Sequence, residues 1–348
     1  MSDRPLTKLG VVAIGRNEGD RLWACLQSAA RCSSTIVYVD SGSTDQSVAM
    51  AVALGVEVVG LDLAQPFTAS RARNAGVRRL MEINPHVEFI QVIDGDCELI
   101  EGWIDAALET MADPKIAVVC GRRRERHPDA SLYNRLCDIE WNTPIGEAAF
   151  CGGDALIRAS ALQQVRGYSE SMIAGEEPEM CMRMRLRGWR VLRIERDMTW
   201  HDAQMMHFGQ WWRRMVRSGH AYAECRALHG RAPAKFFVHE VRSIIEWALL
   251  LPLTAFAAAW WTWGASLALF ALYGVLWRRI YRYRLSQGDT TAIASLYANY
   301  CVLGKFAEMA GIARYWFNRI RGRQSKLIEY KRADASHIAR EIPGALQS

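Results

Sequence analysis

The stretch Val92-Ile93-Asp94-Gly95-Asp96-Cys97 decides how this chain is organised. An apolar run from Phe89 to Ile93 leads directly into two carboxylates separated by one glycine, which indicates a buried strand that ends in a turn. Asp94 and Asp96 at the edge of a sheet repel each other unless a cation lies between them. A hard divalent ion such as Mg²⁺ or Mn²⁺, which binds oxygen ligands and holds substrate phosphates, would relieve that repulsion. The alternative is a β-turn with two solvated aspartates.

Apolar runs alternate with segments of helical spacing between Leu9 and Cys120. This alternation predicts repeated βαβ units, and therefore an α/β fold with a mainly parallel sheet and flanking helices. Ligands of such sheets bind beyond the carboxyl ends of the strands. The polar residues that follow three of the predicted strands should therefore converge on one cleft: Asn17 with Glu18, Asp40, and Asp94 with Asp96.

Charge and cysteine content divide the chain and limit its chemistry. Residues 1–230 hold 27 Lys+Arg and 30 Asp+Glu, whereas residues 231–348 hold 16 and 7, so the second part is basic and should meet an anionic partner. None of the nine cysteines forms a Cys-x-x-Cys pair, which argues against a zinc site and for reduced thiols in the cytosol. The polar start of the chain shows no signal peptide, so this part is expected on the cytoplasmic side.

An apolar segment, Trp247 to Trp277, runs for 31 residues without a charged side chain. It is longer than the roughly 20 residues of one spanning helix and contains Trp260-Trp261-Thr262-Trp263-Gly264, which suits a turn. We expect a helical hairpin over about 244–281 that contacts a membrane, either dipping into the bilayer or crossing it, because arginines flank both of its ends. The alternative is a hairpin buried in a soluble protein. A basic amphipathic helix over about 290–330 should lie on the membrane surface or on the catalytic domain.

Two further groups could complete a site with the aspartates. Asp40, followed by Ser41 and Gly42, could accept hydrogen bonds from a base or a ribose, although a capped turn explains it as well. Arg73 and Asn74, near the start of a helix predicted over 69–81, could grip a diphosphate; the alternative is a solvated helix face.

An acidic cluster and a histidine have both structural and functional readings. The helix dipole alone explains Glu176 and Glu177 at a helix start. They could also supply a general base, because crowded carboxylates raise a pKa. His201 could reach the metal from the far side, or serve as a structural histidine.

Taken together, these residues resemble the family 2 glycosyltransferases, inverting enzymes with the GT-A fold. The resemblance covers about residues 8–225, and its motifs occur in the family's order. They are Arg16-Asn17-Glu18, Asp40-Ser41-Gly42-Ser43-Thr44-Asp45, Arg73-Asn74-Ala75-Gly76, Asp94-Gly95-Asp96, Gly152-Gly153, and an acidic pair before Arg185 and Gly188.

The resemblance implies a role for each motif. Mg²⁺ or Mn²⁺ would be held by Asp94, Asp96 and His201. The family's acidic pair usually ends in aspartate, and here Glu177 fills that place as catalytic base, with Glu176 as the alternative. A nucleoside-diphosphate sugar would meet the substrate-binding residues Asn17, Glu18, Asp40, Ser41, Gly42, Arg73, Asn74, Asp94, Gly152, Gly153 and Arg185.

The hairpin and basic tail resemble enzymes of bacterial exopolysaccharide assembly that work on lipid-linked acceptors. Gln210-Trp211-Trp212-Arg213-Arg214 is close to the Gln-x-x-Arg-Trp of processive members but differs from it, so we expect the transfer of one sugar. The resemblance implies a GT-A domain over 1–230 and a helical membrane-associated region over 231–348. Its partners would be a sugar donor, a lipid-linked glycan acceptor and the cytoplasmic face of the inner or plasma membrane, with no nucleic acid. A nucleotidyltransferase and a non-catalytic nucleotide-binding membrane scaffold are the alternatives.

Overall fold

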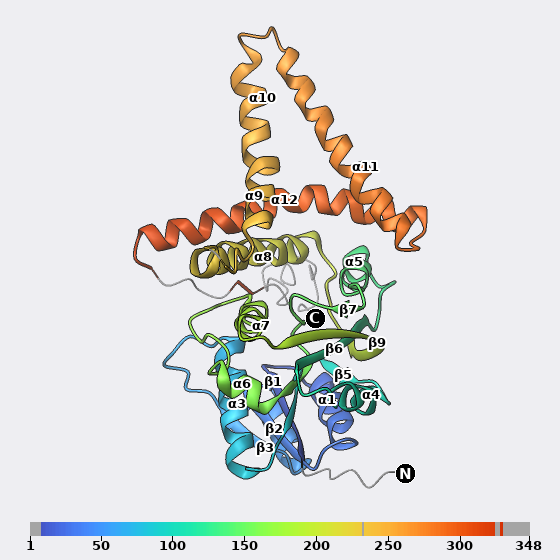
Figure 1. Cartoon of the computed structure of the whole chain (residues 1–348), viewed down its shortest axis with the longest axis vertical. Coiled ribbons are helices and arrows are strands. Elements are labelled where there is room, and N and C mark those ends of the chain that lie inside the picture. The colour runs from blue at the N-terminus through green and yellow to red at the C-terminus, as the bar shows by residue number, and fades with distance from the viewer. Residues whose placement is uncertain (1–7, 232, 324–327, 330–348) are drawn as a thin grey trace, which may run out of the picture.

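A nine-stranded sheet lies at one end of the molecule and a helical hairpin projects from the other, with two adjacent helices between them (Figure 1). This computed structural model describes residues 8–231, 233–323 and 328–329. The strand order is β3-β2-β1-β4-β8-β6-β9-β5, and β7 pairs with β9. The prediction of an α/β fold with flanking helices is confirmed.

The amino-terminal half is a regular parallel unit. β1 pairs in parallel with β2 and β4, and β2 pairs in parallel with β3. Buried apolar residues fill β1 and β2, as expected for strands covered on both faces. The elements are β1 (Leu9–Gly15), α1 (Asp20–Ala30), β2 (Thr35–Asp40), α2 (Ser47–Ala53), β3 (Glu57–Gly60), α3 (Ala69–Ile83) and β4 (Phe89–Asp94).

The other half of the sheet is mixed rather than parallel. β8 pairs antiparallel with β4 and β6, β6 runs parallel to β9, and β5 and β7 pair antiparallel with β9. The elements are β5 (Cys97–Leu99), α4 (Trp103–Thr110), β6 (Ile116–Glu125), α5 (Leu132–Glu140), β7 (Gly146–Glu147), β8 (Ala155–Arg158), α6 (Ala159–Gln164), α7 (Glu176–Leu186) and β9 (Arg190–His201).

Two strands are longer than the sequence predicted. The apolar runs that indicate them stop at Cys120 and Ile194, whereas β6 ends at Glu125 and β9 at His201. Both continue because their charged residues find partners: Arg124 pairs with Asp197 on the adjacent strand at 3.0 Å. His201 is therefore the last residue of a strand and not part of a following loop.

The helical part contains the predicted hairpin. Trp260–Gly264 turns between its two legs, and Trp263 at the tip is 97 % exposed. Among the described helices, Val238–Ala259 is the one long and apolar enough to cross a membrane, and little of it is buried. The elements are α8 (Phe208–His229), α9 (Val238–Ile245), η2 (Glu246–Leu250), α10 (Leu251–Ala259), η3 (Ala265–Phe270), α11 (Ala271–Ser286) and α12 (Thr291–Ile320).

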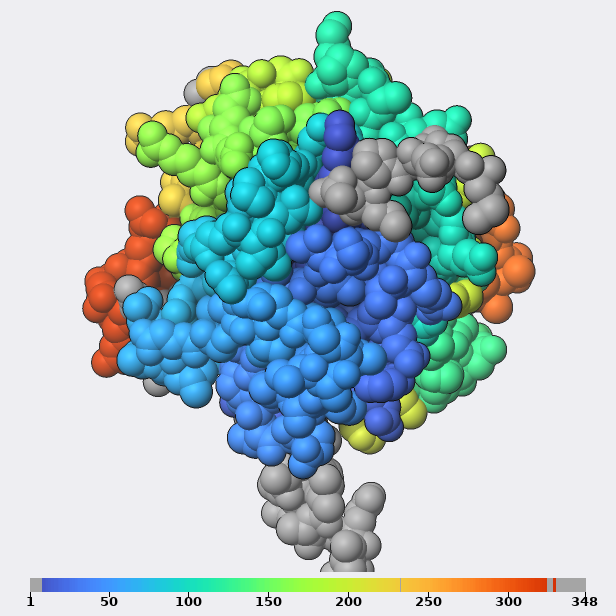
Figure 2. Space-filling view, turned by 90° about the horizontal axis from the view of Figure 1, so that it is seen from below, coloured from blue at the N-terminus to red at the C-terminus, as the bar shows by residue number. Residues whose placement is uncertain are grey.

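α8 and α12 lie along each other between the sheet and the hairpin (Figure 1). Their backbones touch at two glycines: a Cβ on Gly219 would lie 1.9 Å from the carbonyl oxygen of Glu308, and a Cβ on Gly311 would lie 2.0 Å from that of Val216. Only glycine permits so close a contact. From below, the first strands and helices form the surface, and α11 and α12 show at opposite rims (Figure 2). The predicted helix over 290–330 is α12, and the predicted region 231–348 ends in residues that lie largely outside the described part.

Candidate active site

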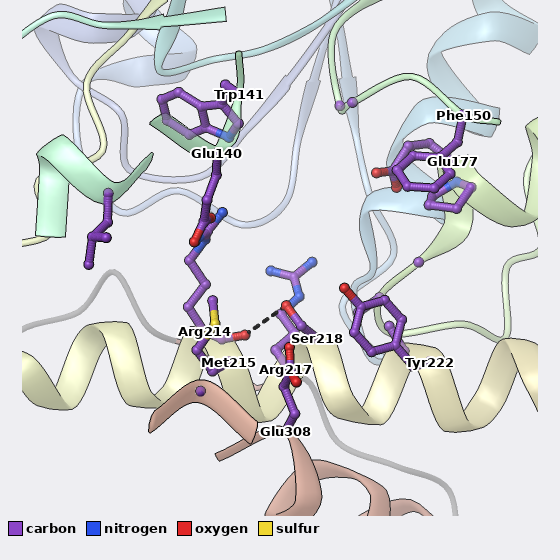
Figure 3. A pocket seen from close by; sticks show the side chains of 18 of the residues that line it. Glu140, Trp141, Phe150, Glu177, Arg214, Met215, Arg217, Ser218, Tyr222 and Glu308 are labelled. Atoms are coloured by element: carbon purple, nitrogen blue, oxygen red, sulfur yellow. Dashed lines mark hydrogen bonds and ion pairs between the residues drawn. The ribbon is translucent and has the colours of Figure 1, made fainter. Parts of the chain in front are cut away.

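A cavity of about 1460 Å³ lies between the sheet and the helical layer. The predicted residues that line it come from five separate segments, and they are Asn17, Glu18, Arg73, Asp94, Gly152, Gly153, Glu176 and Glu177. Glu177 and Phe150 lie on one side, Glu140 and Trp141 on the other, and Arg217 rises from α8 between them (Figure 3). The carboxyl ends of β1 and β4 therefore open on this cavity, as parallel sheets dictate.

Ion pairs join the aspartate motif to the acidic pair. Buried Arg73 on α3 donates to Asp94 Oδ1 at 2.8 Å and to Glu176 Oε1 at 2.7 Å. These two carboxylates raise the pKa of the Arg73 guanidinium against the opposing effect of its burial. Two motifs that are about 80 residues apart in the sequence thus share one cation.

The other side of Asp94 is held by residues that the sequence analysis did not select. Arg123 on β6 lies 3.4 Å from Asp94 Oδ2 and 2.8 Å from Asp154 Oδ2. Asp154 is fully buried, and its Oδ1 accepts a hydrogen bond from the Asp94 backbone N–H at 2.9 Å. Gly153 has a steric role here, because a Cβ on it would lie 2.7 Å from Asp94 Oδ2.

Of the two acidic residues Glu176 and Glu177, Glu177 is the better suited to exchange a proton. It lies in the first turn of α7 and lines the cavity, where desolvation and the neighbouring Glu176 raise its pKa to about 7 although Arg73 opposes them. Glu176 is instead bound by Arg73. The geometry therefore distinguishes the two glutamates, which the sequence alone left open.

A potential metal cluster contains Asp96, Cys97 and His201, whose ligand atoms lie within 4.8 Å of one another. His201 Nε2 lies 3.3 Å from Asp96 Oδ2, and its ring stacks edge-on against Trp141 at 4.8 Å between centroids. Burial lowers the pKa of His201, so the ring is neutral and can offer a lone pair. Burial also raises the pKa of the Cys97 thiol well above its usual range, which makes it a poor ligand.

These donors fit a divalent ion in part. A carboxylate and an imidazole suit Mn²⁺ and, less well, Mg²⁺. The buried Nδ1 of His201 lies 3.6 Å from Glu125 Oε2, so carboxylates face both nitrogens of the ring. Asp94 was expected beside Asp96 as a ligand, but its two oxygens face Arg73 and Arg123.

Five predicted substrate residues do not line the cavity within the described part of the chain. Asp40 accepts hydrogen bonds from the backbone of Gly42 and Ser43, both at 2.9 Å, so it shapes the loop that contains Ser41. Asn74 is engaged with the backbone of Tyr168. Arg185 is exposed on the last turn of α7 and lines a smaller, separate pocket.

Several cavity residues were missed by the sequence analysis. Arg123 lies beyond Cys120, where the apolar run that indicates β6 stops, so the direction of its side chain could not be inferred. Trp141 and Arg217 come from helices far away in the sequence, and no local pattern places them at the site.

Comparisons with known proteins agree with this architecture. Residues 11–165 match the family described as "Glycosyl transferase family 2". A mannosyltransferase from Pyrobaculum calidifontis, solved with GDP-Man and Mn²⁺, superposes with a TM-score of 0.60 at 17 % identity, over 90 % of this chain and 88 % of that one.

Two curated relatives match shorter stretches. A TPR repeat-containing protein from Synechococcus elongatus is 27 % identical over 140 residues, which are 40 % of this chain and 33 % of that protein. A pre-mycofactocin glycosyltransferase from Mycobacterium tuberculosis is 24 % identical over 127 residues, which are 32 % of this chain and 25 % of that protein. The matched part thus spans a third or less of the length of these relatives.

The sheet and its flanking helices have the GT-A fold. The match to glycosyltransferase family 2 covers residues 11–165, a little under half of the chain.

Proposed function

We propose that this chain is a metal-dependent, inverting glycosyltransferase that moves one sugar from a nucleoside-diphosphate sugar to a hydroxyl group of a lipid-linked acceptor. The observation that carries the proposal is the placement of Glu177, whose pKa is about 7, in the same cavity as Asp94. Such a carboxyl can accept a proton near neutral pH. The family match favours this class over a nucleotidyltransferase.

The residues divide the chemistry between them. Asp96 and His201 would hold Mn²⁺ or Mg²⁺, and a bound divalent ion offsets the charge that develops on a departing diphosphate. Glu177 takes the proton of the acceptor hydroxyl, which then attacks the anomeric carbon from the face opposite the nucleotide and inverts it. Arg73 holds Glu176 and Asp94 in place at 2.7 and 2.8 Å, so the charges around the reacting atoms are fixed beforehand.

The protein would work on the cytoplasmic face of the membrane, in the assembly of a cell-surface polysaccharide. The hairpin supports this location. Val241 and Ile244 are buried against α8 and α12, so the part of this leg that can enter a bilayer is Glu246–Ala259. Fourteen helical residues extend about 21 Å, which is less than the ~30 Å hydrocarbon core. A hairpin of this depth would dip into the membrane without crossing it and would keep both of its basic flanks on one side.

One assay tests the proposal. The full chain is incubated with Mn²⁺, a panel of UDP- and GDP-sugars and a membrane extract that supplies lipid acceptors. Release of nucleoside diphosphate and the anomeric configuration of the product are measured. Glu177→Gln should lower transfer by about 10²–10⁴ with unchanged donor binding, and Glu109→Gln, an exposed change on α4, should not.

The wild-type rate should fall as the pH drops through about 7, because protonated Glu177 cannot act as a base. EDTA should abolish transfer, and Mn²⁺ should restore it. A product that keeps the anomeric configuration of the donor would disprove inversion. Unimpaired transfer by the Glu177→Gln variant would show that Glu177 is not the base. Donor binding without turnover under every condition would favour the non-catalytic scaffold.

A further inference from the structure

The cavity is larger than a sugar nucleotide requires. Ligand pockets commonly measure about 300–1,000 Å³, whereas this one measures about 1460 Å³ and continues from Glu177 to the base of the hairpin. Its far end is lined by residues from both legs, among them Trp247, Val275 and Arg279. One continuous space thus connects the proposed base with the place where the apolar hairpin begins.

The far end combines an apolar wall with a cation. Trp247, Val275, Leu276 and Ile280 line it, and Arg279 lies among them on α11. Within the described part of the chain, Arg279 forms no ion pair, whereas Lys305 at the same end pairs with Glu308 at 3.5 Å. Arginine binds phosphate through parallel hydrogen bonds. A hydrocarbon wall beside such a cation fits a molecule that has an anionic head and an apolar chain.

Along α11, the apolar residue lies on the side of the hairpin tip and the arginine on the side of the sheet, as expected if the tip enters a membrane. Val275 and Arg279 are four residues apart and so lie on one face of the helix. Val275 is nearer to the hairpin tip, and Arg279 is one turn nearer to the sheet. A lipid phosphate bound by Arg279 would therefore direct its chain along Val275 into the bilayer and its glycan toward Glu177.

We propose that the hairpin end of the cavity is a binding site for the phosphate of a prenyl-type lipid acceptor, and that Arg279 binds this phosphate. This inference rests on the proposed function, since it names the class of acceptor. Arg279 is distinguished from its neighbours Arg278 and Arg282, which do not line the cavity in the part of the chain that the structure describes. Those two would serve general attraction to anionic lipid.

The test measures binding of farnesyl phosphate, farnesol and inorganic phosphate to the full chain in neutral detergent, by tryptophan fluorescence. Farnesyl phosphate should bind at least tenfold more tightly than either of the other two. Arg279→Gln should remove this preference, and Arg278→Gln should keep it. The pair is matched, because both variants lose one charge at adjacent positions of the same helix.

Other outcomes would overturn the inference. They are equal binding of farnesyl phosphate and farnesol, equal binding of inorganic phosphate, equal effects of the two variants, and equal competition by phosphatidylglycerol micelles. The proposed function fails separately, when no sugar nucleotide is turned over. Turnover without prenyl-phosphate preference refutes only the lipid site, and preference without turnover refutes only the glycosyltransferase.

Discussion

At the sheet end of the cavity, charged side chains hold each other through short ion pairs, whereas the hairpin end is lined by apolar residues together with Arg279 and Glu246. Arg73 is 3 % exposed and bridges Asp94 and Glu176, and Arg123 adds Asp154 to the same network. Charges that are buried and paired keep a fixed geometry, because an unpaired buried charge costs several kcal/mol. The sheet end is therefore organised before any ligand arrives, and the hairpin end can adapt to a flexible chain.

The largest expected effect tests this contrast directly. Arg73→Leu should lower the free energy of unfolding by about 3–5 kcal/mol, because it leaves Glu176 buried without its cation. Arg279→Gln, at the other end, should change it by less than about 0.5 kcal/mol. Urea denaturation of both variants in detergent provides the measurement. Equal losses would show that the two ends are not built differently.

An intermediate effect concerns the contact of α8 and α12, which forms the floor of the hairpin end. Gly311→Ala places a methyl group 2.0 Å from the carbonyl oxygen of Val216, so it should cost about 1–3 kcal/mol. Gly304→Ala is the matched control on the same helix, since its Cβ would lie 3.8 Å from Met215 and Trp211. It should be neutral or stabilising by up to about 1 kcal/mol. Thermal unfolding compares the two, and an equally stable Gly311→Ala variant would refute the close contact.

The smallest effect on the folded protein is expected at the hairpin tip. Trp260, Trp261 and Trp263 are 85, 78 and 97 % exposed, so replacing all three with serine should leave the unfolding midpoint unchanged. Binding to vesicles of phosphatidylglycerol and phosphatidylcholine should nevertheless weaken at least about tenfold, because buried apolar area is lost from the bilayer contact. Co-sedimentation measures this. Unchanged vesicle binding would argue that the tip contacts another protein surface.

The sequence predicted the sheet end well because its residues follow strand ends. Asn17, Asp94 and Glu176 belong to motifs that parallel strands and a helix start bring to one edge. Apolar periodicity also identified the hairpin and its turn at Trp260–Gly264.

What the sequence missed depends on tertiary pairing. The polar extensions of β6 and β9 have no apolar pattern, so Arg123 was not placed at the site. Asp94, which is predicted as a metal ligand, lies against two arginines that only tertiary packing brings to it. Arg217 and Arg279 reach the cavity only because α8 and α11 pack above the sheet, and a helical period cannot say which side faces a distant domain.

The stacking of α12 on α8 has a geometric consequence (Figure 1). Two layered helices are together about 20 Å thick, and with the hairpin inserted as proposed they set a constant stand-off between the lipid headgroups and Glu177. A glycan must span that height before its terminal hydroxyl can react. The fold would thus select acceptors by the length of their glycan. A glycan that is too short would not reach Glu177, and the terminal hydroxyl of a long glycan would not be held at a defined position there.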